Sequence, residues 1–306
     1  MTPVHYVAVA NIIGDDLSLP NGTQRRGILG GAGTYAAAGM RIWSDHVGIV
    51  SGVGEDFEDM YGSWFDQNQI AKLGLHVRAP NTPRSWINYK SADERTEVPQ
   101  FGTEHFKLME PTIDDIPTSY LGARGIYFFR DTDSEYWNKV FEIKGKHHFT
   151  TVWEIHAGAA NAENWDRVST ILSRIELFSI NLAEATQLCG LTEPIRIIEK
   201  LLSTGIKGVA LRSGSLGTII ASPYGVWRIA AYQTQVTDVT GAGNAFTGGF
   251  LVGYCESNSN IAIAGQYGAV SASFILEQHG PPSRIDDKTY QLAQMRCQSL
   301  TPVRIA

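Results

Sequence analysis

Short apolar, β-branched runs alternate along this chain with segments of helical spacing, and this alternation limits the fold more than any other feature. The predicted strands cover residues 4–10, 46–51, 125–129, 148–153, 177–180 and 208–211. The predicted helices cover residues 34–43, 57–73, 165–173, 182–189, 194–203 and 245–254. Strand followed by helix, repeated, predicts an α/β fold in which a largely parallel sheet is covered on both faces.

One segment, residues 81–107, interrupts the alternation with interleaved polar and aromatic side chains and no helical stripe. We expect extended strands or a hairpin outside the main sheet, placed to cover a site as a lid. A decorated surface loop is the alternative interpretation. Because the 306 residues contain no repeat, low-complexity tract or Ser/Pro linker, we predict one domain over 1–306.

Composition and charge narrow the class of protein. Hydrophobic residues make up 43% of the chain and charged residues 18%, which excludes disordered, collagen-like and disulfide-scaffold classes. With 25 Lys and Arg against 31 Asp and Glu, and no basic stretch, nucleic acid is not an expected partner. The three scattered cysteines, Cys189, Cys255 and Cys297, suit a reducing compartment. No secretory leader and no run of about 18 apolar residues is found, so we expect a cytoplasmic protein without membrane partners.

The sharpest local motif is DVTGAGNAFTGGF at 238–250. Gly241 and Gly243, with Ala242 between them, permit a tight turn whose backbone N–H groups point one way. The helical stretch that follows adds the positive end of its dipole, so the turn is a predicted anion hole suited to phosphate. A plain strand-to-helix connection would leave the same short glycine pattern.

Five elements, taken in order, resemble the PfkB/ribokinase family of small-molecule kinases. They are GGAGTYAA at 30–37, GVGEDF at 52–57, NLAE at 181–184, RSGSLG at 212–217 and the 238–250 motif. The family patterns are GGxxxNxA, GxxGxDxxG, NxxE, TxGxxG and DTTGAGDxFxGG. The resemblance implies a ribokinase-like three-layer sandwich with a mostly parallel central sheet and a small β lid. It also implies ATP-dependent phosphorylation of a hydroxymethyl group on a small-molecule substrate.

The resemblance implies a substrate pocket. Asp15 is similar to the acidic residue that binds substrate hydroxyls, and Gly30 and Gly31 would let the backbone approach the substrate. Tyr35 stands where the family has Asn, so its bulk would fill part of the pocket. Trp86, in the expected lid, is a further candidate contact, although tryptophan is more often a core residue. Asp15 beside Asp16 also fits a solvated turn, and the glycine elements near 30 and 52 also fit tight connections.

The resemblance further implies a nucleotide site with bound cations. ATP phosphates would lie on Gly241, Ala242 and Gly243, and the nucleotide would contact Arg212, Gly214 and Gly217. Mg²⁺ would be held through water by Asn181 and Glu184, and a monovalent cation by Asp238 and Thr240. Asn181 followed three residues later by Glu184 is equally an N-cap with its capping-box partner.

Asn244 stands where the family has its catalytic aspartate. An amide cannot accept the proton of an attacking hydroxyl near neutral pH, although it can orient that hydroxyl. Loss of a general base typically costs about 10²–10⁴-fold in rate, so we expect weakened base catalysis. Arg212, in place of a small threonine, would pair with a phosphate or occupy its space.

Glu154 and His156 end a predicted strand, where α/β sheets place their ligands, and are candidates for a replacement acid and base. A satisfied structural histidine is the alternative. GGAGTYAA, Trp153-Glu154, RSGSLG and GAGN together resemble a divergent, mainly fungal branch of the family. Three functions remain open: a small-molecule kinase with weakened base catalysis, a nucleotide- or ligand-binding pseudokinase, and a repurposed, non-phosphorylating enzyme. A homodimer formed through the lid is a further prediction.

Overall fold

A computed structural model describes residues 3–89 and 95–306. Its large sheet has the order β14-β13-β12-β11-β10-β9-β8-β1-β4-β5. The strands, in chain order, are β1 (Tyr6–Val9), β4 (Val47–Gly54), β5 (Ala71–Ala79), β8 (Gly125–Arg130), β9 (Thr150–Ile155), β10 (Leu177–Asn181), β11 (Gly208–Arg212), β12 (Thr218–Ser222), β13 (Gly225–Ile229) and β14 (Val303–Arg304). Neighbours from β5 to β11 are parallel, and β12, β13 and β14 continue the sheet antiparallel.

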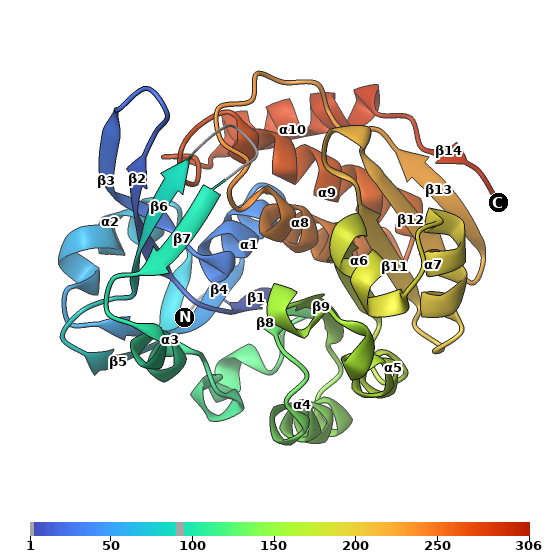
Figure 1. Ribbon diagram of the computed structural model, residues 1–306, viewed down its shortest axis with the longest axis horizontal. Helices are drawn as coiled ribbons and strands as arrows, with labels where there is room; N and C mark the ends of the chain where they lie inside the picture. Colours follow the sequence, from blue (N-terminus) through green and yellow to red (C-terminus); the bar gives the residue numbers. More distant parts are fainter. Residues whose placement is uncertain (1–2, 90–94) are drawn as a thin grey trace.

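Helices cover both faces of this sheet (Figure 1). One layer contains α1 (Ala32–Arg41), α8 (Ala242–Glu256), α9 (Ile261–Leu276) and α10 (Asp287–Ser299). The other contains α4 (Ser134–Lys146), α5 (Trp165–Leu172), α6 (Leu182–Cys189) and α7 (Pro194–Leu202). Because strand side chains alternate between faces, Tyr127 joins the first core and Phe128 the second. The predicted three-layer α/β fold is confirmed.

A small sheet stands apart from the large one and forms the lid (Figure 1). Its order is β3 (Gln24–Gly30), β2 (Ile13–Ser18), β6 (Arg84–Tyr89) and β7 (Arg95–Pro99). The small β lid is therefore confirmed, but two of its strands come from before residue 81. The expectation of extended structure to residue 107 is wrong at its end, because α3 (Thr103–Met109) begins there. Residues 90–94 of the predicted excursion lie outside the described residues.

The helix predicted over 57–73 is wrong in its second half. A π-helical turn (Glu58–Gly62) and α2 (Ser63–Gln67) end at Asn68, and the chain then forms β5. The Asn68 side chain donates to the Trp64 carbonyl and accepts from the Ile285 N–H, and the next residue, Gln69, has φ 56°. A left-handed residue after an asparagine cap stops a helix, and strand pairing with β4 replaces it.

Within the described part of the chain, no helix combines the length and the apolar character that crossing a bilayer requires.

Candidate active site at the glycine turn

The predicted anion hole lies at the start of α8. Gly241, the N-cap, has φ 76°, and a Cβ at this position would overlap the buried ring of Tyr35. A Cβ on Gly243 would overlap the guanidinium of Arg212. Among the described residues no side chain caps this helix, and the Ala242 N–H makes only a long, 3.4 Å hydrogen bond to the Val239 carbonyl. No side-chain acceptor therefore competes with an anion for the N–H groups of the first turn.

Asn244 belongs to a buried hydrogen-bond network rather than standing alone at the turn. Its Nδ2 donates to the Tyr127 hydroxyl at 3.1 Å, and that hydroxyl donates to Glu154 Oε2 at 3.0 Å. Glu154 Oε1 in turn pairs with Arg212 Nη2 at 2.7 Å. Burial, reinforced by the Glu154 charge, raises the pKa of Tyr127 well above its ordinary value, so the phenol remains protonated. The Asn244 amide nitrogen is thus engaged by Tyr127, and its carbonyl oxygen is the other polar atom of this side chain.

The topology explains why this network forms. Tyr127, Glu154 and Arg212 come from β8, β9 and β11, and their side chains meet near one edge because parallel strands share a carboxyl-end edge. Helix α8 is fixed against β10 by the Thr247 hydroxyl, which donates to Ser179 Oγ at 2.8 Å. The site is thus built on rigid elements.

Asn181 and Glu184 use their side chains to cap α6. Asn181 Oδ1 accepts from the Glu184 N–H at 2.8 Å, and Glu184 Oε2 accepts from the Asn181 N–H at 3.3 Å. The capping-box alternative is confirmed. Burial raises the pKa of Glu184, although the charge of Arg212 opposes the rise. These residues do not fit a divalent ion held directly, and in the described chain no three His, Cys, Asp or Glu side chains cluster as metal ligands.

Asp238 ties the lid to the glycine turn. Its Oδ1 accepts from the Thr240 N–H and the Tyr89 hydroxyl, each at 2.9 Å, and its Oδ2 lies 3.1 Å from His279 Nδ1. Burial opposes ionisation of Asp238, but the hydrogen bonds from Thr240, His279 and Tyr89 outweigh it and lower its pKa. Neither Tyr89 nor His279 belongs to a recognisable motif, so the sequence pattern does not point to them.

Replacing Tyr89 by Phe should loosen the lid while preserving the aromatic ring. A hydrogen bond to a charged group contributes about 1.5–3 kcal/mol, so amide exchange in β6 and β7 should accelerate by about tenfold or more. Hydrogen-exchange mass spectrometry measures this directly. Tyr224→Phe, at a hydroxyl-bearing side chain that is 85% exposed, is the control and should leave lid exchange unchanged. Equal amide exchange of β6 and β7 in Tyr89→Phe and in wild type would show that the hydrogen bond from Tyr89 to Asp238 does not hold the lid.

Asp15 is buried on a strand of the lid rather than in a solvated turn. It is 4% exposed on β2, and a Cβ on Gly30 would overlap its carboxylate. Gly31, at φ 91°, packs against the backbone of the segment between β1 and β2. Trp86 is 49% exposed, and because Asp15 pairs with Ser85 in register, Trp86 lies on the opposite face of the lid. The structure therefore does not bring Trp86 to Asp15.

The RSGSLG segment forms the tight turn between β11 and β12. Gly214 and Gly217 have φ 56° and 86°, and a Cβ on Gly217 would overlap the Ile229 carbonyl. His156 is exposed, with its ring 5.3 Å from that of Phe129, and takes no part in the Glu154 network.

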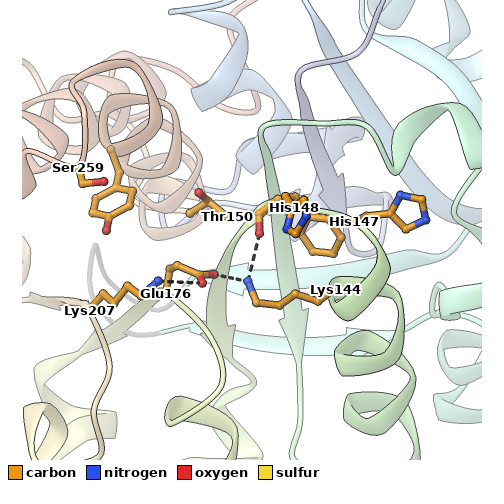
Figure 2. Close-up of a pocket in the computed structure, with 9 residues that line it drawn as sticks. Lys144, His147, His148, Thr150, Glu176, Lys207 and Ser259 are labelled. Carbon is orange, nitrogen blue, oxygen red and sulfur yellow. Dashed lines mark hydrogen bonds and ion pairs between the residues drawn. The ribbon is translucent and has the colours of Figure 1, made fainter.

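A separate cavity of about 410 Å³ opens near the amino ends of β9 and β10. Figure 2 shows Lys144 and Lys207 reaching the same carboxylate, Glu176, with nitrogen-to-oxygen distances of 2.5 and 3.4 Å. Glu176 also accepts from the Thr151 N–H at 3.0 Å. These charges satisfy one another at the sheet edge opposite the glycine turn, so the cavity adds no residue to the candidate site.

Comparisons with known proteins agree with this geometry. Residues 7–288 match the pfkB family carbohydrate kinases. A Schizosaccharomyces pombe protein described as uncharacterized is 24% identical, covering 92% of this chain and 86% of its own length. A cytidine kinase from Thermococcus kodakarensis is 25% identical, covering 81% and 87%. A putative ribokinase II from E. coli, solved with ATP and Mg²⁺, superimposes with a TM-score of 0.78 at 17% identity, over 97% of this chain and 99% of that one. With the motifs in place on a ribokinase-like fold, this chain belongs to the pfkB family of carbohydrate kinases.

Proposed function

We propose that the protein, taken as one domain over 1–306, is an ATP-dependent phosphotransferase acting on a hydroxyl of a sugar, nucleoside or related metabolite. The observation that carries the proposal is the uncapped glycine turn of Gly241 to Gly243 at the start of α8, covered by the lid that Tyr89 anchors. A phosphate-sized anion suits such a turn. The relative named cytidine kinase supports this class of substrate.

In the proposed reaction the backbone N–H groups from Gly241 to Asn244 donate to the transferring phosphoryl group and stabilise its charge. Asp15 accepts hydrogen bonds from the substrate's hydroxyls. The Asn244 carbonyl orients the attacking hydroxyl but does not remove its proton, so transfer is slow. The nucleotide lies along Arg212, Gly214 and Gly217.

Two cation roles stay predictions. Mg²⁺, which accompanies ATP in the structurally similar E. coli protein, was predicted on Asn181 and Glu184 through water. A monovalent cation was predicted on Asp238 and Thr240. Stimulation of activity by K⁺ over Na⁺ at constant ionic strength would support the second role.

A nucleotide- or ligand-binding pseudokinase is the second candidate, with a repurposed, non-phosphorylating enzyme as its variant. The observation in favour is the hydrogen-bond network from Asn244 through Tyr127 and Glu154 to Arg212. In this network the residue at the family's catalytic position makes contacts that stabilise the fold. In either case the anion site would bind ligand without phosphoryl transfer.

The experiment that separates these functions is a screen for acceptor-dependent ADP release from ATP, across sugars, nucleosides and related metabolites. The kinase proposal expects slow ADP release that requires a particular acceptor. ATP binding with no acceptor-dependent release for any compound would favour the pseudokinase instead.

We also propose a cytoplasmic protein that forms a homodimer through the outer face of the lid. Trp86 and Val98, paired in register, are 49% and 47% exposed there. Trp86→Lys should convert the dimer to a monomer in sedimentation analysis, because it places a charge in an apolar interface. Tyr224→Lys, far along the large sheet, is the matched control and should stay dimeric. A wild-type monomer at all concentrations would contradict the dimer.

A further inference from the structure

We propose that Arg212 supplies the positive charge of the phosphate site, so that the site binds nucleotide phosphate without a divalent ion held by the protein. The inference rests on the proposed function, since it needs an anion at the glycine turn. In this inference the Arg212 guanidinium, rather than a bound metal ion, neutralises the phosphate.

The guanidinium of Arg212 lies between a carboxylate and the helix start. Nη2 is 2.7 Å from Glu154 Oε1, and Nη1 occupies the space that a Cβ on Gly243 would take. Its side chain is only 13% exposed, and within the described residues Nε is buried without a hydrogen-bond partner. A planar guanidinium held this way offers donors in the fork geometry that suits phosphate oxygens.

Each residue expected to order a divalent ion gives one side-chain oxygen to a capping box. Asn181 Oδ1 accepts from the Glu184 N–H, and Glu184 Oε2 accepts from the Asn181 N–H, which leaves these two oxygens less free to order the water around an ion. Arg212 is near enough for its charge to act on the Glu184 carboxyl as well as on Glu154. A metal ion placed between these carboxylates would face a fixed positive charge. The NxxE pattern is kept in this chain, but the arginine at position 212 places a positive charge where the family has a small residue.

The pairing also predicts how each partner affects binding. Glu154 competes with an incoming phosphate for Arg212, and its removal frees the guanidinium. Loss of Arg212 removes the charge and leaves two carboxylates near the anion site. The two substitutions should therefore change phosphate affinity in opposite directions, which a purely structural ion pair would not do.

Calorimetric titration with ATP, in EDTA and separately in Mg²⁺, tests the inference. Wild type should bind ATP in EDTA within about threefold of its affinity in Mg²⁺, and Arg212→Thr should bind about tenfold or more weakly in EDTA, as one lost charge-assisted hydrogen bond implies. Mg²⁺ should restore part of that loss, because it can use the freed carboxylates. Glu154→Gln should bind ATP about threefold or more tightly than wild type in EDTA.

Glu176→Gln is the matched control, since Glu176 is also a mostly buried carboxylate paired with basic side chains, at the opposite edge of the sheet (Figure 2). It should leave ATP affinity unchanged. Wild type that binds ATP only with Mg²⁺, or weaker binding by Glu154→Gln, would overturn the role of Arg212 while leaving the proposed function standing. If Arg212→Thr does not fold, Glu154→Gln decides alone. Absence of ATP binding by folded wild type in both conditions would overturn the proposed function and this inference together.

Discussion

The Asn244→Asp variant should phosphorylate its acceptor at least about tenfold faster than wild type, because a general base contributes about 10²–10⁴-fold. The Tyr127 hydroxyl has one proton and already donates it to Glu154. We expect partial burial and repulsion from Glu154 to favour the protonated form of the new carboxyl more than in a solvated aspartate. A base with a pKa nearer neutrality accepts a proton effectively at physiological pH. Steady-state rates of acceptor-dependent ADP release measure the gain.

Asn244→Ala is the control for this substitution. It removes the amide without adding a carboxylate, so its rate should be no higher than that of wild type. An Asp variant that folds and binds ATP and acceptor, yet phosphorylates no faster, would contradict the missing-base account. The result would then favour binding or repurposed chemistry at this site.

The second large effect is expected at Gly241, where valine should reduce ATP affinity by about 10² or more. A left-handed backbone costs a side-chain-bearing residue about 1–2 kcal/mol, and overpacking against the Tyr35 ring adds about 1–3 kcal/mol. To relieve that clash, the first turn of α8 must move. The shift would misplace two backbone N–H donors to the charged phosphate, which accounts for the expected loss of ATP affinity. Titration with ATP and thermal unfolding measure the two effects.

Gly190→Val separates backbone strain from the clash. Gly190 has φ 65°, close to the value at Gly241, but a Cβ there meets nothing within 4 Å. This control should lose stability and keep ATP affinity. Gly243→Val should weaken ATP binding through the Arg212 contact with less strain, since its Cβ meets the end of a flexible side chain. Undiminished ATP affinity in a folded Gly241→Val variant would remove the anion site.

The sequence predicted the α/β class because buried parallel strands appear as apolar runs. It missed α9, although that helix is 16 residues long, because apolar residues surround it and no amphipathic stripe remains. The sequence pattern also predicted a helix that continued into β5, because hydrophobic spacing does not reveal the left-handed backbone of Gln69 just before that strand. Tertiary packing determines that α9 forms, and the backbone conformation of Gln69 determines where the helix before β5 ends.

At the candidate site, the glycine turn could be proposed from its local motif, and Asp15 from the resemblance to the family. Tyr127 could not, since a buried aromatic in a strand looks like core, and its partner Asn244 is 117 residues away along the chain. Tyr89 and His279 reach Asp238 from 149 and 41 residues away along the chain. Such networks arise only from the folded arrangement of several elements.

The central claim is that this chain transfers a phosphoryl group from ATP to a hydroxyl. The most direct measurement is detection of the phosphate ester by ³¹P NMR after wild-type protein is incubated with ATP and each acceptor that stimulates ADP release. We predict a slowly formed ester of a sugar, nucleoside or related metabolite, absent without the acceptor. Bound ATP that persists with no ester on any acceptor, in wild type and in Asn244→Asp alike, would contradict the claim.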